Sequence, residues 1–227
     1  SLLRVAQVDY VKPEQMQSQE FGYRGKLSRT FTVDAAVYRN DFQDFINTQV
    51  VLSPLYGEVG DGGLSVLAMA NGDFETWSSY TNSPAEISSW GVSIGAQTKI
   101  FGNFDLSANY TKSKLEFEQS LYPDFRTNWN TPEHKIKAQF GNTQLFENFG
   151  FNVAWRYWSE YLWQASFGDG MVPETHVIDA QFNLTVPKWK SVIKVGATNL
   201  GGEEYFTAFG SGFIGTQYYI SWTANNF

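Results

Sequence analysis

Aromatic side chains are the residues of this chain best suited to recognising a ligand. They gather in or beside its long connections, and such rings can stack on a sugar, a peptide or an aromatic chelate. We therefore predict ligand contacts at eight of them: Trp77, Tyr80, Tyr122, Phe125, Trp129, Trp158, Tyr161 and Trp163. Phe167 lies in the last of these clusters. The alternative is that the rings pack the loops onto one another, because long loops need small cores of their own.

Metal and cofactor chemistry is poorly supported. The only histidines, His134 and His176, lack a metal-site spacing, and the chain has no cysteine. Three loop carboxylates, Glu58, Asp61 and Asp73, lack the alternating spacing of a calcium loop. We expect no metal site and no cofactor, and we expect the histidines to support turns or lie at an interface.

Enzymatic motifs are equally weak. The stretch 210–215 fits the pattern G-x-G-x-x-G, but no strand-turn-helix unit surrounds it, and a strand follows instead. A nucleophile elbow of the G-x-S-x-G type is absent from the sequence. We therefore predict no catalytic residue and expect a protein that is not an enzyme.

Composition restricts the partners. The formal net charge is −7 and the basic residues form no cluster, so a phosphate backbone is not an expected partner, and we predict no nucleic-acid binding. Charged residues make up only 17% of the chain while aromatic residues also reach 17%, which indicates a surface less polar than that of a soluble domain. Mean hydropathy is −0.32 and no apolar run is long enough for a helical span, so any membrane crossing must use strands.

Alternation of apolar and polar residues predicts about nine strands. Between them the connections run short, long, short, long; the longest, of about fifty residues, separates the second strand from the third. The predicted strands are 20–27, 31–38, 90–100, 104–111, 135–140, 151–158, 177–184, 192–198 and 217–227. The short connections are centred on Ser28, Gly102, 143–147 and Trp189. This rhythm is typical of a transmembrane β-barrel, which has short periplasmic turns and long extracellular loops.

The polar face of these strands consists mainly of Gly, Ser, Thr, Asn and Gln with scattered charges. A soluble β-sandwich usually exposes Lys and Glu there, whereas a wet barrel lumen suits the observed residues. We predict an all-β fold, an antiparallel transmembrane barrel segment. A soluble carbohydrate-binding sandwich is the alternative.

Nine strands cannot form a closed bacterial barrel alone, because those barrels have an even number of strands and an open edge in lipid is costly. We therefore expect residues 1–227 to be the C-terminal part of a larger barrel whose other strands lie upstream. The same topology puts the C-terminus in the periplasm. The first residues lack a signal peptide, which fits either a removed export sequence or a start inside a longer chain.

Three short motifs carry a family resemblance. Lys12-Pro13-Glu14 precedes Glu20-Phe21-Gly22-Tyr23-Arg24-Gly25, Thr131-Pro132-Glu133-His134-Lys135 opens a strand, and Thr198-Asn199-Leu200 is followed by Glu204-Tyr205. Their order and spacing resemble the last part of a TonB-dependent outer-membrane receptor. The sequence departs from the family where Thr216 follows Gly215, since arginine is common at that position.

The resemblance implies a receptor that uses energy passed through TonB to take up a scarce nutrient such as an iron chelate, a glycan, a peptide or a vitamin. It implies a barrel of about 22 strands, an upstream plug and a TonB-contacting segment. The expected partners are outer-membrane lipid, the remaining strands and plug of the same receptor, TonB and an unknown small ligand, in the bacterial outer membrane. A passive porin or an adhesin barrel is the alternative.

Two finer expectations concern aromatic residues. Rings near strand ends are predicted at the membrane interfaces: Trp90, Tyr110, Trp155, Tyr157 and Trp189. In the last strand Tyr218, Ile220 and Trp222 share a face, but Phe227 falls on the other. That break predicts a bulge near Asn225-Asn226 or an inward Phe227.

Overall fold

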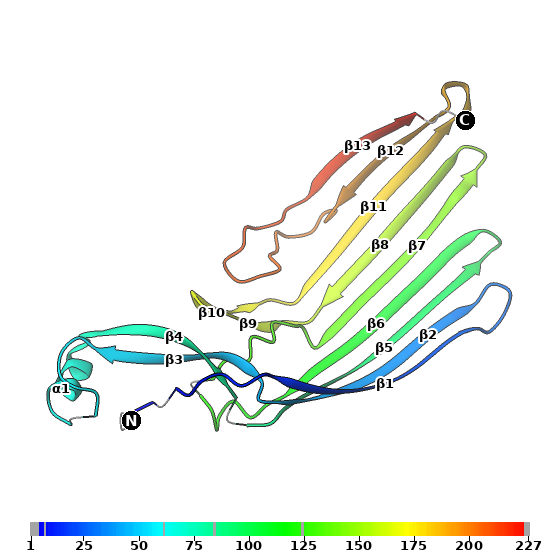
Figure 1. Ribbon diagram of the computed structural model, residues 1–227. Coiled ribbons are helices and arrows are strands. Elements are labelled where there is room, and N and C mark those ends of the chain that lie inside the picture. Colours follow the sequence, from blue (N-terminus) through cyan, green and yellow to red (C-terminus); the bar gives the residue numbers. More distant parts are fainter. Residues whose placement is uncertain (1–4, 7, 61, 84, 124, 225–227) are drawn as a thin grey trace.

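A single antiparallel sheet of nine strands dominates the molecule (Figure 1). The computed structural model describes residues 5–6, 8–60, 62–83, 85–123 and 125–224. Neighbouring strands of the sheet follow one another in the order β1-β2-β5-β6-β7-β8-β11-β12-β13. They are β1 (Gln15–Lys26), β2 (Thr32–Gln43), β5 (Ile87–Ile100), β6 (Phe104–Glu116), β7 (His134–Phe146), β8 (Phe149–Trp158), β11 (Thr175–Val186), β12 (Ser191–Thr198) and β13 (Gln217–Ala224). The nine predicted strands are confirmed.

The predicted rhythm of connections is also confirmed. Short turns lie at one end of the sheet and long connections at the other, which we call the loop end (Figure 1). The turn between β5 and β6 illustrates the local cause, because Phe101 and Gly102 both have positive φ, 47° and 90°, as tight hairpin turns require. The turn after β7 is shorter than predicted, since β7 continues past an irregularity between Asn142 and Phe146.

The long connections contain regular elements that the sequence pattern did not reveal. Between β2 and β5 the chain forms a hairpin of β3 (Ile46–Pro54) and β4 (Phe74–Asn82), with the short helix α1 (Leu64–Asn71) at its tip. Between β8 and β11 lies a second hairpin of β9 (Tyr161–Ala165) and β10 (Gly168–Val172). The long connection expected between the second and third strands is therefore present, as 44–86, but most of it is regular structure. The first hairpin projects beyond the sheet (Figure 1), and its strands carry no regular alternation of apolar and polar residues.

The register of the sheet places the apolar residues of all nine strands on one face. One row across five strands joins Ala35, Ile94, Tyr110, Ile136 and Tyr157. Large side chains of this face are open to the surroundings; Phe182, for example, is 52% exposed and Ile220 is 76% exposed. A sandwich would cover such residues with a second sheet, so the sandwich alternative is wrong.

The height of the apolar face matches a lipid bilayer. Trp90 and Ile100 are ten residues apart on β5, about 34 Å along the strand, or about 26 Å if the strand tilts by ~40°. That is close to the ~25 Å apolar band of outer-membrane barrels. Among the described residues no helix is both long and apolar enough to cross a membrane.

Aromatic side chains concentrate at both ends of this face. At the loop end Trp155, Tyr157 and His176 stack, with ring centroids 4.8 to 6.3 Å apart, and the Tyr110 hydroxyl lies 2.8 Å from Nδ1 of His134. At the turn end the rings of Phe104, Phe140 and Phe151 lie 5.4 to 6.2 Å apart. These are the positions where an aromatic girdle is expected.

The interfacial predictions agree with this arrangement. Trp90 lies near the loop end of β5, with Nζ of Lys112 5.4 Å from its ring centroid, while Trp189 lies in the 3-10 turn η1 (Pro187–Trp189) at the opposite end and is 63% exposed. In β13, Tyr218, Ile220 and Trp222 share the apolar face as predicted. The expected irregularity at Asn225-Asn226 and the orientation of Phe227 lie outside the described residues.

The two outer strands of the sheet, β1 and β13, each pair on one side only within the described chain. Every residue of β13 is exposed. An edge of this kind leaves backbone N–H and C=O groups unpaired, which costs several kcal/mol per group in lipid.

An added positive charge should cost much more stability on the apolar face than on the polar face. In the complete receptor, Ala108→Arg places a guanidinium on the apolar face between Ala96 and Ala138 and should lower the free energy of unfolding by about 2–4 kcal/mol. Ala154→Arg places the same group on the polar face opposite Asp179 and should change it by less than about 1 kcal/mol. Denaturant unfolding in lipid vesicles measures both; equal losses would contradict the assignment of faces.

Candidate ligand-binding site

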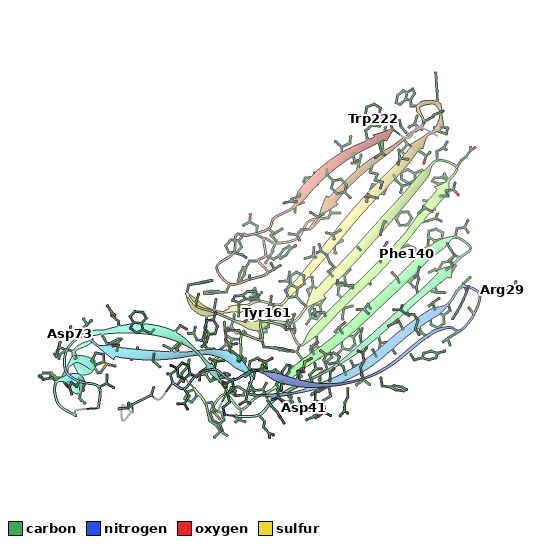
Figure 2. The ribbon with its side chains drawn as sticks, viewed as in Figure 1. Arg29, Asp41, Asp73, Phe140, Tyr161 and Trp222 are labelled. Carbon is green, nitrogen blue, oxygen red and sulfur yellow. The ribbon has the colours of Figure 1, made fainter. Side chains whose placement is uncertain are left out.

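The long connections are joined to one another by hydrogen bonds at the loop end. The connection 117–133 lies against β3, where Phe125 forms an isolated bridge with Gln49 and the Asn47 amide donates to the Thr127 carbonyl at 2.8 Å. Figure 2 shows side chains gathered densely there, with Tyr161 where the sheet meets the loops. We call these joined connections the loop layer.

Gln164 of β9 holds the connection 117–133 on its other side. Its side-chain oxygen accepts from the Asn128 backbone at 3.1 Å and from the Thr127 hydroxyl at 3.4 Å. Its backbone exchanges two bonds with the Asn130 amide, at 2.7 and 3.0 Å. Asn128 and Asn130 both have left-handed φ, 49° and 45°, which asparagine tolerates better than most residues. Gln164 is only 8% exposed, so these bonds are sheltered from water.

Arg126 adds a charged contact to the same junction. Its guanidinium donates to the Ala165 carbonyl at 2.8 Å and lies 3.5 Å from the Asp169 carboxylate. The β9–β10 hairpin in turn contacts the connection 199–216, where the Tyr161 hydroxyl donates to the Thr207 carbonyl at 2.7 Å. Burial raises the pKa of the Tyr161 phenol above its ordinary value. The loop layer thus runs from β3 to the last long connection.

Asn199 fixes the start of that last connection. It has a left-handed φ of 51°, its amide donates to the Glu203 carbonyl at 2.9 Å, and its carbonyl accepts from the Thr216 hydroxyl at 2.6 Å. The sequence motif around Asn199 therefore has a structural role, which is to close the loop between β12 and β13.

The Lys12-Pro13-Glu14 motif has a similar role at the base of the β3–β4 hairpin. The Lys12 backbone exchanges two bonds with the Asn82 side chain, at 2.7 and 3.0 Å. The Glu14 carboxylate accepts from the Ile46 backbone at 2.9 Å. These bonds attach the chain before β1 to the hairpin.

Several predicted ligand residues contribute to packing within the loop layer. Phe125 is 3% exposed and packs on Phe45 and Phe117, and Tyr122 stacks on Phe117 at 5.9 Å. Trp158 packs edge-on against Tyr205 at 5.5 Å. These rings therefore pack the loops onto one another, which was the alternative to ligand contact.

The other predicted ligand residues are more accessible. Trp77 and Tyr80 lie on β4 and are 57% and 69% exposed, so they lie on a strand and not in a loop. Tyr161 and Trp163 lie on β9 with their rings 6.4 Å apart, and Trp129 is half-buried in the connection 117–133. The structure does not bring all eight residues into one pocket, and their binding role stays a prediction.

The polar face of the sheet carries ion pairs and tyrosines that lie flat on it. Lys99 pairs with Asp105 at 3.0 Å, Arg156 with Asp179 at 2.9 Å, and Arg24 with Asp34. Tyr38 lies over Gly91, where a Cβ would be 2.6 Å from the ring, and reaches the Ser113 hydroxyl at 3.2 Å. Tyr219 similarly crosses Gly196 to reach Gln181 at 3.0 Å.

Two lysines on this face, Lys135 and Lys137, form no ion pair within the described residues. Neither lysine was among the predicted ligand residues, which are all aromatic. The register of the sheet distinguishes them from other lysines, because it places Lys137 directly opposite a second cation, Arg156.

Charge is unevenly distributed over the chain. The four long connections, 44–86, 117–133, 159–174 and 199–216, contain fourteen Asp and Glu residues but one Arg, a net charge of −13 in a chain of −7. Some of these acids are paired: Lys112 lies 3.1 Å from Glu133, and this hydrogen bond lowers the pKa of Glu133.

The acids do not make an evident metal site. Within the described ranges, no group of three or more His, Asp or Glu side chains is arranged to hold a metal ion. Asp73 accepts from the Tyr56 hydroxyl at 3.0 Å, while Asp61 lies outside the described residues.

A sheet with a lipid-sized apolar face, a polar opposite face and a layer of long loops at one end defines part of a transmembrane β-barrel wall. The family described as "TonB dependent receptor-like, beta-barrel" matches residues 5–200. The chain therefore belongs to this family of outer-membrane receptors, as the sequence motifs indicated. TonB-dependent receptors are transporters and not enzymes, in agreement with the sequence-based expectation.

Solved structures show the same fold at low identity. The FrpB iron transporter from Neisseria meningitidis is 13% identical, with a TM-score of 0.64 over 95% of this chain and 31% of that one. The copper transporter OprC is 16% identical, with a TM-score of 0.62 over 87% and 27% of the two chains. The siderophore receptor PirA from Acinetobacter baumannii is 15% identical, with a TM-score of 0.60 over 93% and 32%. The chain thus spans about a third or less of these structures. Among curated proteins no match was found.

Removing the Gln164 side chain tests the loop layer. In the complete receptor, Gln164→Ala deletes the acceptor of two bonds and should weaken the junction by about 1–3 kcal/mol. Amide hydrogen exchange across 119–130 should then be about tenfold faster or more, while β7 and β8 stay protected. Gln144→Ala, at the turn end, is the control and should leave exchange in 119–130 unchanged. Equal exchange in both variants would contradict the junction.

Proposed function

We propose that this chain forms part of a receptor that takes up a scarce nutrient with energy delivered by TonB. The observation that carries the proposal is the combination of a two-faced barrel wall with an ordered layer of long loops at one end. A wall of this kind encloses a path through lipid, and an ordered loop layer presents side chains to a ligand before it enters.

The names of similar structures support uptake without identifying the ligand. They include a copper transporter, an iron transporter and a siderophore receptor. For this chain the candidates are an iron chelate, a glycan, a peptide or a vitamin. The candidates for contact with it are the exposed Trp77 and Tyr80 of β4 and the half-buried Trp129, Tyr161 and Trp163 of the loop layer.

The remainder of the receptor is also part of the proposal. The unpaired sides of β1 and β13 favour pairing with further strands of a larger barrel, of about 22 strands, because an open edge in lipid is unfavourable. We place a plug and the TonB-contacting segment outside the present chain, the apolar face against outer-membrane lipid, and the short turns and the C-terminus in the periplasm.

Uptake should depend on both the gene and the proton gradient. In the native bacterium, deletion of the gene should reduce to background the uptake of one or more probes among radioiron-loaded chelates, labelled cobalamin, maltodextrins and oligopeptides. A protonophore should have the same effect in the parent strain, because TonB transmits energy from that gradient. Gene-dependent uptake that persists after the gradient is collapsed would favour a passive porin, and loss of no probe on deletion would also contradict the proposal.

Cysteine labelling tests the orientation, because the chain itself has no cysteine. Ser78→Cys on β4 should react with a membrane-impermeant maleimide in intact cells, whereas Asn103→Cys in the short turn after β5 should react only after the outer membrane is opened. The parent receptor, without either cysteine, sets the background. Labelling of Asn103→Cys alone in intact cells would reverse the proposed orientation.

A further inference from the structure

Three cations lie together on the polar face near the loop end. Lys137 of β7 is the direct partner of Arg156 of β8, and Lys135 lies two residues along β7, opposite Trp158. We call Lys135, Lys137 and Arg156 the basic triad. Alternation puts all three side chains on the face opposite Ile136, Trp155 and Tyr157.

The arrangement is electrostatically unfavourable as it stands. Like charges directly opposite each other on antiparallel strands destabilise the pair. Among the described residues, one carboxylate is bonded to the triad: Asp179 binds Arg156 at 2.9 and 3.2 Å and also accepts from the Asn199 backbone at 3.1 Å. Lys135 and Lys137 have no ion-pair partner in the described part of the chain, in contrast to Lys99 on the same face, which pairs with Asp105.

Two further hydrogen-bond donors at the triad lack an acceptor. The Nε–H of Arg156 and the indole N–H of Trp158 are shielded from solvent and have no partner among the described residues. A shielded donor without an acceptor costs about 1–3 kcal/mol. The triad and Trp158 therefore combine excess positive charge with N–H donors that lack an acceptor. Binding sites for oxyanions such as carboxylate and phosphate have these two properties.

The position of the triad suits a solute that has passed the loop layer. Trp158 is the last residue of β8, and its ring packs on Tyr205 of the connection 199–216. Lys135 is the second residue of β7, immediately after the connection 117–133. The triad thus lies on the wall just beneath the loops.

The loops above restrict the kind of anion. Their net charge of −13 repels a polyanion, but six of the fourteen acids belong to 44–86, whose hairpin projects beyond the sheet (Figure 1). Since charges are screened beyond about 8 Å at physiological salt, a small group is affected only by its nearest neighbours. A small solute with one or a few acidic groups therefore fits better than nucleic acid or another large polyanion.

We propose that the basic triad binds a carboxylate or phosphate group of the transported solute, which places that solute among small anions. The inference rests on the proposed uptake function. Lys135 and Lys137 supply the two free ammonium groups, and Arg156, oriented by Asp179, supplies the third positive charge. Trp158 then binds the solute through its indole N–H or its ring and is not only a packing residue.

Anion binding by the complete purified receptor in detergent tests the triad. The probes are citrate and inorganic phosphate, titrated by calorimetry at constant ionic strength set with chloride. The parent receptor should bind at least one probe, and the double variant Lys135→Gln/Lys137→Gln should bind it at least tenfold more weakly. The matched control, Lys26→Gln/Lys194→Gln, removes two lysines of the same face that lie opposite Thr32 and Asn183 and should bind like the parent.

Thermal unfolding gives an independent readout. Without added anion the triad variant should be at least as stable as the parent, because like-charge repulsion is relieved, and only the parent and the control should gain stability with the bound probe. No binding by the parent, or equal binding by all three proteins, overturns the proposal. A parent that does not respond while the triad variant is destabilised also overturns it, since carboxylates elsewhere in the receptor then occupy the triad. The assay needs neither TonB nor a proton gradient, so its failure is distinct from failure of the uptake experiment.

Discussion

The need to hydrogen-bond every backbone group away from water determines this structure. In lipid a strand cannot leave its N–H and C=O groups unpaired, so each of the seven inner strands of the sheet pairs on both sides. Because a shift of one residue would move every side chain to the other face, the pairing also fixes which residues meet lipid. The continuous apolar face with its aromatic ends follows from this pairing, and the edges at β1 and β13 are where the requirement is still unmet within the described chain.

The loop layer depends on a different kind of bonding. Beyond the apolar face the connections lie in water, where backbone groups can hydrogen-bond to solvent without pairing to another strand. The layer is held by specific side chains such as Gln164, Arg126 and Asn199. Hydrogen bonds of this kind are each worth about 1 kcal/mol, so the layer is ordered but less stable than the sheet. That difference is consistent with the proposed uptake, in which the loops would admit a ligand while the wall stays rigid.

The polar face combines neutralised and unneutralised charge. Where a cation faces a carboxylate, as with Lys99 and Asp105, the two charges neutralise each other without a bound anion. Where Lys137 faces Arg156, the sheet keeps a repulsive contact that a mutation to a neutral residue would relieve. The proposed anion site explains why such a contact is placed beneath the loops and not among the paired charges nearer the turns.

The nine strands, their faces and the family could be predicted from the sequence, because alternation is a local property and each tight turn is encoded by a few adjacent residues. The sequence did not reveal the β3–β4 and β9–β10 hairpins, because their strands carry no regular alternation of apolar and polar residues. It could not separate packing rings such as Phe125 from exposed ones such as Trp77, since burial depends on residues far away in the chain. Only the tertiary structure placed Lys137 against Arg156, because register across strands joins residues that no local pattern connects.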